Sequence, residues 1–159
     1  MDVHPRSLAL AALALAGASL AGVALTSGGW RLGLGALTIL ADNADQIARK
    51  LGFPLHVATV CSRSILARQL PAALGDVRRT TSWQDVVADP EIDIVAELIG
   101  GTGDASQLLE AAIRNGKSVV TANKELLANV GSELADVAEA NGVDLLYEAA
   151  VVAGIPFIR

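Results

Sequence analysis

A glycine-rich stretch at residues 28–35 has the residue types that a phosphate-binding turn needs. Compared with the G-x-G-x-x-G pattern of dinucleotide-binding turns, it supplies Gly28 and Gly33 but has Trp30 where the middle glycine belongs. The middle glycine lets the backbone approach a pyrophosphate, and an indole side chain at that position would obstruct the approach. A register that starts at Gly33 and Gly35 has no third glycine, so an ordinary glycine-rich turn is the alternative.

A basic residue follows the apolar run at residues 55–60, where an acidic residue would bind the ribose hydroxyls of NAD. Arg63 stands there between two serines, a combination that suits the 2′-phosphate of NADP. An ordinary surface arginine is the alternative on spacing alone. The neighbouring Cys61 has no apparent activating histidine, so we expect an inert thiol.

Two further loops follow strand-like runs. Gly100, Gly101 and Thr102 form the first, and its glycines would let the backbone pass close to a cofactor, unless they only make a flexible strand-to-helix turn. Asn123 and Lys124 form the second. A partly buried lysine there could donate a proton or bind a phosphate, whereas a solvated charge at a helix start is the alternative.

A carboxylate stands at the end of the last strand-like run, next to a segment rich in small and apolar residues. Glu148 is followed there by the sequence AAVVAGIP. Main-chain carbonyls in a turning segment, together with one carboxylate, make an oxygen-rich site for a Group 1 or Group 2 cation. A turn with no bound ion is the alternative.

The elements that would position these loops alternate between strand and helix after residue 33, with no internal repeat. Apolar periodicity, capping residues and glycine stops predict helices at residues 36–50, 83–88, 105–114 and 125–141. Short β-rich runs predict strands at residues 55–60, 77–80, 93–99, 118–121 and 143–147. This order predicts an α/β fold with a doubly wound parallel sheet, a Rossmann-type domain whose ligands bind at the carboxyl ends of the strands.

The N-terminal part of the chain differs in composition from the rest. Residues 8–25 carry no charge and consist mainly of Ala and Leu, which just reaches the length of a membrane span. A buried helix and a stretch not native to the domain are the alternatives, because an Ala-rich run is less hydrophobic than typical spans. We therefore separate an apolar segment at residues 1–27 from a nucleotide-binding domain at residues 28–159, with the first β-loop incomplete.

Composition excludes several classes of function. The chain has 159 residues, a net charge of -5 and 3% aromatic residues, so neither a basic nucleic-acid surface nor a base-stacking platform is expected. One cysteine and two histidines make a disulfide framework and a zinc site equally improbable.

Taken in order, three segments of the chain resemble homoserine dehydrogenase. They are VAELIGGT at residues 95–102, VTANK at 120–124 and EAAVVAGIP at 148–156, and residues 42–52 resemble that family's first helix. The resemblance covers about residues 33–159 and implies an oxidoreductase that interconverts L-aspartate 4-semialdehyde and L-homoserine with NADP(H) or NAD(H). It also implies a place in threonine and methionine biosynthesis, a cytoplasmic location and a homodimer.

The resemblance also implies roles for individual residues. Lys124 would contact the nicotinamide end of the cofactor and take part in proton transfer, with Asn123 beside it. Arg63 would bind the NADP phosphate, and Thr102 would line the cofactor cleft. A sodium-type cation would bind Glu148 and three main-chain carbonyls, those of Val151, Ala153 and Ile155.

Two departures from the family pattern bear on function. The loop at residues 28–33 lacks the middle glycine, and the chain stops at Arg159, before the family's substrate domain. We therefore expect a fragment that is catalytically incomplete alone, with its small-molecule substrate bound by the missing domain. The alternative function is a non-catalytic module that binds NADP or a partner, with a membrane tether through residues 8–25 as a less favoured addition.

Overall fold

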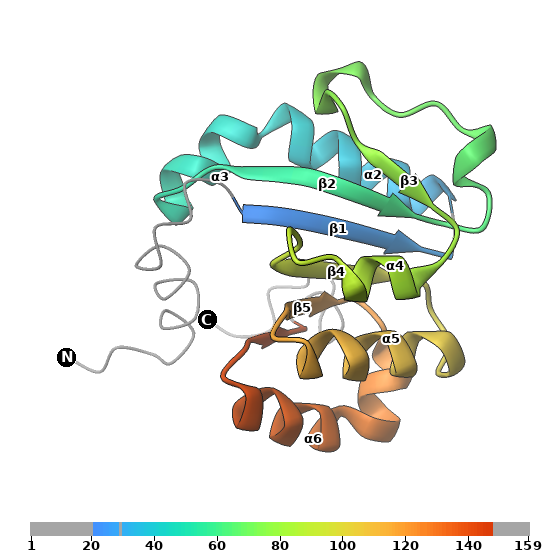
Figure 1. Ribbon diagram of the computed structural model, residues 1–159, viewed down its shortest axis with the longest axis vertical. Helices are drawn as coiled ribbons and strands as arrows, with labels where there is room; N and C mark the ends of the chain where they lie inside the picture. Colours follow the sequence, from blue (N-terminus) through green and yellow to red (C-terminus); the bar gives the residue numbers. More distant parts are fainter. Residues whose placement is uncertain (1–20, 29, 148–159) are drawn as a thin grey trace, which may run out of the picture.

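The computed structural model describes residues 21–28 and 30–147 as a six-stranded sheet with helices on both faces (Figure 1). All neighbouring strands run parallel, in the order β3-β2-β1-β4-β5-β6. The strands are β1 (Ala21–Ser27), β2 (Leu55–Cys61), β3 (Arg78–Thr80), β4 (Ile94–Leu98), β5 (Ser118–Thr121) and β6 (Leu145–Leu146). This is the strand order of a doubly wound dinucleotide-binding fold, so the predicted fold class is confirmed.

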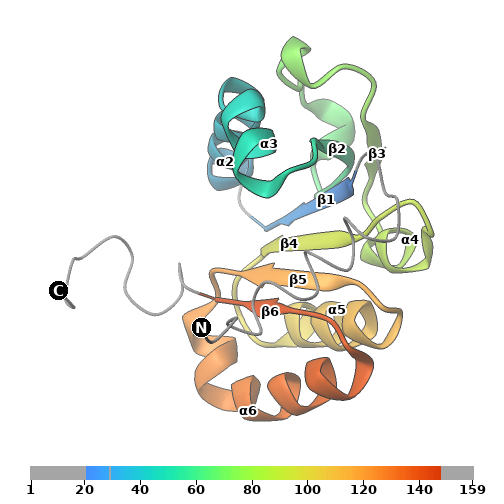
Figure 2. The ribbon, with the colours of Figure 1, turned by 90° about the vertical axis from the view of Figure 1, so that its left-hand side faces the viewer.

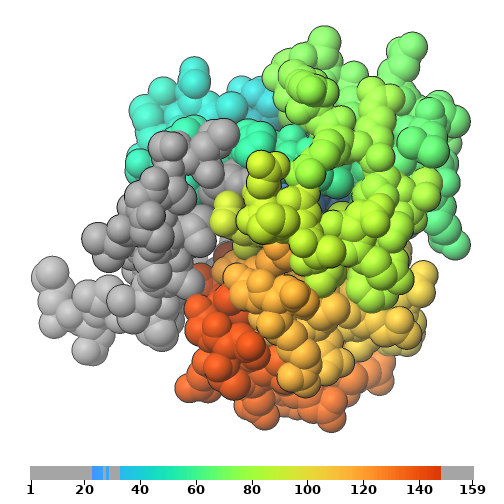
Figure 3. Space-filling model, viewed as in Figure 1, coloured from blue at the N-terminus to red at the C-terminus, as the bar shows by residue number. Residues whose placement is uncertain are grey.

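The helices divide between the two faces of the sheet (Figure 2). The α-helices are α2 (Trp30–Asp42), α3 (Ala44–Leu51), α4 (Trp83–Ala88), α5 (Gly103–Arg114) and α6 (Lys124–Asn141). Two short 3₁₀ turns, η2 (Ile65–Ala67) and η3 (Ala72–Leu74), connect β2 to β3. Helices α2 and α3 lie over one face, while α4 and α5 lie against each other over the opposite face (Figure 3).

The core consists of two apolar layers, one on each side of the sheet. Successive residues of β1 point to opposite faces, so Ala24 packs with α5 and α6 while Leu25 packs with α2. Val57 and Ala58, successive residues of β2, divide between the layers in the same way. Strand β1 pairs with β2 on one side and with β4 on the other, and both of its faces are buried. It therefore lies in the buried centre of the sheet.

The first strand lies inside the segment that the sequence analysis separated from the domain. Residues 23–26 are buried in β1, at the centre of a parallel sheet, and not in a helix. Small apolar residues suit that position because both faces of the strand are covered. None of the helices in the described part of the chain has the length and apolar character needed to cross a bilayer. No strand was predicted here because these small apolar residues also suit a buried helix or a membrane span.

Two local predictions differ from the structure. The helix predicted at residues 36–50 is broken at Asn43, whose main-chain and side-chain N–H groups both donate to the carbonyl of Ile39. The almost entirely apolar sequence of β5 is typical of a strand covered on both faces, but Val120 is 38% exposed. Because α5 and α6 both cover the other face, the described residues leave the Val120 side of this strand open.

Candidate functional site

The carboxyl ends of the parallel strands bring the predicted loops to one edge of the sheet. Gly28 follows β1, Arg63 follows β2, Gly100 follows β4 and Asn123 follows β5. Neighbouring parallel strands end side by side, so these loops lie along the same edge.

Gly28 and Arg63 line one small hollow at this edge. The hollow encloses about 80 Å³, and its other lining residues are Cys61, Ser62, Thr81, Trp83, Ile99 and Asp104. Arg63 is exposed, which leaves its guanidinium accessible to a phosphate group. An arginine beside exposed glycine backbone fits the adenosine end of a dinucleotide better than it fits an apolar ligand.

Gly28 is required by a close approach between two loops. A Cβ added at Gly28 would lie 2.3 Å from the carbonyl oxygen of Ile99, far inside any normal contact. The Gly28 amide donates to the carbonyl of Leu98 at 3.3 Å, which ties the turn after β1 to the end of β4. The first glycine of the predicted pattern therefore has a steric function in the fold, whether or not a ligand is bound.

The other glycines predicted to bind the cofactor, Gly33, Gly100 and Gly101, differ in their backbone conformation. Gly33 is buried within α2, one turn from its start, so it forms part of the helix behind the turn. Gly100 and Gly101 have φ values of 78° and 71°, in the left-handed region that favours glycine. Thr102 is the exposed residue before α5, and its side chain makes no capping hydrogen bond.

Asn123 is largely buried and its carboxamide bonds within the protein through both of its polar atoms. Its Oδ1 accepts a hydrogen bond from the amide of Leu126 at 3.1 Å, which caps the start of α6. Its Nδ2 donates to the carbonyl of Gly101 at 2.6 Å and so joins the loop after β5 to the loop after β4. The sequence predicted a cofactor contact here, and the structure gives Asn123 a role in holding two loops together.

Lys124 is the first residue of α6 and is exposed. A cation at a helix N-terminus lies at the positive end of the helix dipole, which disfavours it on electrostatic grounds. The local fold therefore does not explain a lysine at this position. Binding of an anionic ligand, or of a reacting group, would explain it. Lys124 and Tyr147 line a groove along α6, separate from the hollow that Gly28 and Arg63 share.

Cys61 behaves as the sequence analysis expected of an inert thiol. It is 6% exposed, and burial, reinforced by the charge of Asp85, raises the pKa of its thiol to about 11. The thiolate that would act as a nucleophile is therefore scarce at neutral pH.

Sequence reasoning missed the residues that follow β3 and the buried acid of β4. Thr81, Trp83 and Asp104 line the hollow with Arg63, and β3 was the one strand whose carboxyl end was not considered. Glu97 is fully buried at the end of β4 and binds both Thr121 and the loop at residues 99–100. An acidic residue in an otherwise apolar strand, three positions before a pair of glycines, was the available signal.

Four predicted site residues and one side chain lie outside the described residues. The proposed cation ligands are all in the C-terminal segment, namely Glu148, Val151, Ala153 and Ile155. The side chain of Trp30 is likewise not described, although its backbone begins α2. Within residues 21–28 and 30–147, no group of three or more His, Cys, Asp or Glu side chains could hold a metal ion.

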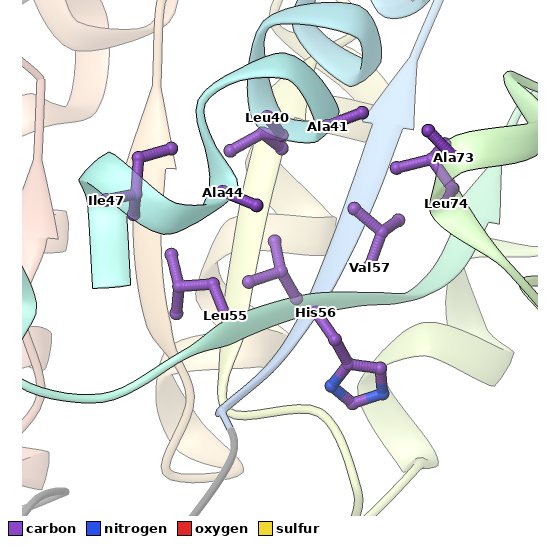
Figure 4. Close-up of a pocket in the computed structure, with 10 residues that line it drawn as sticks. Leu40, Ala41, Ala44, Ile47, Leu55, His56, Val57, Ala73 and Leu74 are labelled. Atoms are coloured by element: carbon purple, nitrogen blue, oxygen red, sulfur yellow. The ribbon is translucent and has the colours of Figure 1, made fainter. Parts of the chain in front are cut away.

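A second cavity lies at the opposite end of the strands and has a different character. It encloses about 140 Å³ between α2, α3 and the starts of β1 and β2, and its lining is apolar apart from His56. Figure 4 shows the apolar side chains gathered around it and the imidazole of His56 pointing away from the helices. With no convergent polar groups, this cavity has nothing to orient a ligand.

The strand order, the glycine turn after β1 and the loops along the carboxyl edge together define a Rossmann-type dinucleotide-binding domain. Comparison with known proteins agrees with this class and narrows it. Residues 31–148 match the family described as homoserine dehydrogenase, NAD-binding domain. The chain therefore belongs to the homoserine dehydrogenase family, through its NAD-binding domain.

Individual relatives give the same result. The chain is 42% identical over 129 residues to a homoserine dehydrogenase of Neisseria gonorrhoeae, covering 80% of this chain and 29% of that protein. It is 39% identical over 128 residues to the Bacillus subtilis enzyme, with the same two coverages. The crystal structure of a homoserine dehydrogenase from Thiobacillus denitrificans superposes with a TM-score of 0.77 at 45% identity, over 86% of this chain and 31% of that one. The chain thus spans about three-tenths of the length of these relatives.

Proposed function

We propose that this chain binds NADP(H) or NAD(H) along the carboxyl edge of its sheet, as the cofactor domain of a homoserine dehydrogenase. The observation that carries the proposal is the family match over residues 31–148, on a fold whose ligand-binding edge gathers the predicted loops. The reaction proposed for the whole enzyme is the interconversion of L-aspartate 4-semialdehyde and L-homoserine. The comparisons give no support to the alternative of a non-catalytic module.

Each loop would contribute a separate part of cofactor binding. Arg63 would bind the 2′-phosphate of NADP, and the turn from Gly28 to the start of α2 would receive the pyrophosphate at the helix N-terminus. Gly100, Gly101 and Thr102 would line the middle of the cleft. The cofactor supplies hydride transfer, and Lys124 would hold or move a proton at its Nζ beside the nicotinamide end.

Cofactor titration of the 159-residue chain tests this proposal most directly. We expect binding of NADPH, measured by calorimetry, to be weak because Trp30 replaces the middle glycine. Arg63→Ala should weaken NADPH binding about tenfold, or about 1.4 kcal/mol, and change NADH binding much less. Arg68→Ala, in the same connection and exposed, is the matched control and should change neither. If neither NADPH nor NADH binds, even to the Trp30→Gly variant, the proposal is wrong.

The reaction itself belongs to the longer enzyme. We expect the 159-residue chain to give no homoserine-dependent reduction of NADP at ordinary enzymatic rates, because it matches only three-tenths of its relatives. Such activity in the isolated chain would show that the substrate-binding groups lie within these residues. A homodimer and a cytoplasmic location, where the cofactor and amino-acid precursors are available, are proposed for the longer enzyme on the same basis.

The sodium-type cation site is a proposal that depends on the resemblance alone. Glu148 would supply a carboxylate, and Val151, Ala153 and Ile155 would supply carbonyl oxygens, the ligand type that hard cations prefer. If the site binds sodium, NADPH affinity should respond to exchange of sodium for tetramethylammonium at constant ionic strength. Glu148→Ala should remove that response, and its persistence would contradict the assignment.

A further inference from the structure

A carboxylate with no ligand role in the function proposed above connects the two loops on which cofactor binding depends. Glu97 is 0% exposed and lies near the end of β4, in the middle of the carboxyl edge. A buried carboxylate is costly unless hydrogen-bond donors satisfy its oxygens. The structure supplies three such donors: the amides of Ile99 and Gly100, in the loop after β4, and the hydroxyl of Thr121, the last residue of β5.

The first oxygen holds the loop after its own strand. Oε1 of Glu97 accepts hydrogen bonds from the amide of Ile99 at 2.6 Å and from that of Gly100 at 3.1 Å. Both amides point back toward β4, which fixes the direction in which the chain leaves the strand. Gly100 and Gly101 then continue in the left-handed conformation that Glu97 helps to fix.

The second oxygen holds the loop after the neighbouring strand. Oε2 of Glu97 accepts from the hydroxyl of Thr121, and the two residues are the last paired positions of β4 and β5. The same hydroxyl oxygen accepts from the amide of Asn123 at 3.1 Å. Thr121 thus connects Glu97, through two hydrogen bonds, to Asn123, the residue that caps α6.

Asn123 makes a second connection between the two loops. Its Nδ2 donates to the carbonyl of Gly101, one residue beyond an amide that Glu97 binds. Its Oδ1 fixes the start of α6, where Lys124 is the first residue. The hydrogen bonds from Glu97 through Thr121 and Asn123 to Gly101 therefore form a ring, which we call the edge ring.

We propose that Glu97 is a positioning residue that sets, through the edge ring, the relative placement of the Gly100–Gly101 loop and Lys124. A carboxylate is the group that this position requires, because an ionised acid only accepts and all three of its partners donate. Glutamine has the same size but carries an N–H₂ group, which would face either the loop amides or the Thr121 hydroxyl. The proposal rests on the proposed function for its cofactor readout, but not for its structural readout.

Amide hydrogen exchange of the cofactor-free 159-residue chain tests the coupling. Glu97→Gln should speed exchange at least tenfold at Ile99 and Gly100, and also at Asn123 and Leu126 across the ring. Exchange at the centre of α5 should change much less. Glu110→Gln, an exposed acid paired with Arg114, is the matched control and should leave all four amides unchanged. Faster exchange confined to Ile99 and Gly100 would overturn the coupling.

A second variant keeps the test decisive if Glu97→Gln fails to fold. Thr121→Val removes only the hydroxyl that links the two loops, and Thr121→Ser retains it. Thr121→Val should speed exchange at Ile99 and Gly100, which Thr121 does not itself contact through a hydrogen bond, and Thr121→Ser should restore the original rates. Unchanged rates at those two amides in Thr121→Val would overturn the proposal.

Cofactor affinity separates positioning from general support of the fold. Glu97→Gln and Thr121→Val should weaken NADPH binding at least tenfold, and Thr121→Ser should bind normally. Leu108→Ala, which truncates a fully buried side chain of α5, should lower stability without that loss of affinity. Equal losses of affinity in all destabilised variants would reduce Glu97 to a structural residue. If the unsubstituted chain binds neither NADPH nor NADH, the proposed function fails, and the exchange rates still decide the coupling.

Discussion

The two halves of the carboxyl edge are built in different ways. In the half formed by β4 and β5, side chains bind one another and hold the loops, with Glu97 satisfied by three donors. In the half formed by β1 and β2, backbone proximity holds the turn, because Gly28 packs directly on the carbonyl of Ile99. The buried ionisable group of that half is Cys61, whose charged form burial disfavours.

From this difference we expect the two halves to tolerate sequence change differently. A turn held by one close contact and one main-chain hydrogen bond requires a glycine at that contact and places less constraint on neighbouring side chains. A residue other than glycine can therefore stand at position 30, where α2 begins. A loop held by a hydrogen-bond ring requires several residue types at once. The departure from the family pattern at residues 28–33 and the agreement at residues 95–102 and 120–124 follow this division.

The largest effect is expected at Gly28. Gly28→Ala places a Cβ 2.3 Å from the Ile99 carbonyl oxygen, and relieving that clash should lower the free energy of unfolding by about 3 kcal/mol. Urea denaturation followed by circular dichroism measures the loss. Gly35→Ala is the control, because its Cβ meets no atom within 4 Å and it lies in α2. Alanine there should be neutral or stabilise by about 0.5 kcal/mol, and similar losses in the two variants would remove the steric argument.

The next effect concerns the pH dependence of stability at Cys61. Below the ordinary thiol pKa of 9.0, both the folded and the unfolded chain keep the proton, so its contribution to stability is fully present. Between pH 9 and the folded pKa of about 11, only the unfolded chain loses it, and stability falls with rising pH by at most roughly 2.7 kcal/mol.

The matched variant for this prediction is Cys61→Ala, which lacks the titrating group. The stability difference between the original chain and Cys61→Ala should shift by roughly 2–3 kcal/mol against the original chain from pH 8 to pH 11. Burial lowers the pKa of Lys117, which makes stability rise with pH, but Lys117 is present in both proteins and cancels in the difference. A difference independent of pH would contradict the raised thiol pKa.

A smaller effect is expected at the start of α2. Trp30→Gly restores the middle glycine of the phosphate-binding pattern and should tighten NADPH binding about tenfold, or about 1.4 kcal/mol. Calorimetric titration measures the change, with Thr38→Ala on the exposed side of the same helix as control. Unchanged or weaker binding in Trp30→Gly would show that the indole does not obstruct the cofactor.

The smallest effect concerns the cap of α6. Asn123→Ala removes both the side-chain acceptor for the Leu126 amide and the donor to the Gly101 carbonyl, and should cost about 1 kcal/mol of unfolding free energy in all. Asn129→Ala is the control, because Asn129 is an exposed residue of the same helix whose side chain donates to the carbonyl of Glu125. Thermal denaturation of both variants measures the contrast, and equal losses would mean that capping contributes nothing here.

The sequence predicted the second half of the fold better than the first. Helix α5 and strand β5 were found within two residues because capping residues and glycine stops mark their ends. Strand β1 was missed because its small apolar residues match a helix or a membrane span equally well, and only burial between two other strands distinguishes them. The break at Asn43 was missed because apolar periodicity continues across it.

The sequence predicted which loops form the candidate site, but not the contacts between their residues. The sequence located Gly28, Arg63 and Lys124 at strand ends, and the structure places the first two in one hollow. The partners of Glu97 could not be read from the sequence, because Thr121 is 24 residues away and the other two donors are main-chain amides. Spacing along the chain predicts which residues share an edge, but the hydrogen-bond partners are determined by the register of parallel strands.

The central position of β1 has a consequence for the order of folding during synthesis. β1 is made first, yet its partner on one side is β4, and the hydroxyl of Thr26 bonds the carbonyl of Ala96, 70 residues later. At a synthesis rate of about 5–20 residues per second, roughly 4–14 seconds pass before that partner emerges from the ribosome. Before β4 arrives, β2 is the only neighbour with which β1 can pair once it has emerged, so the other edge of β1 stays open and we expect the nascent chain to be most prone to aggregation in this interval.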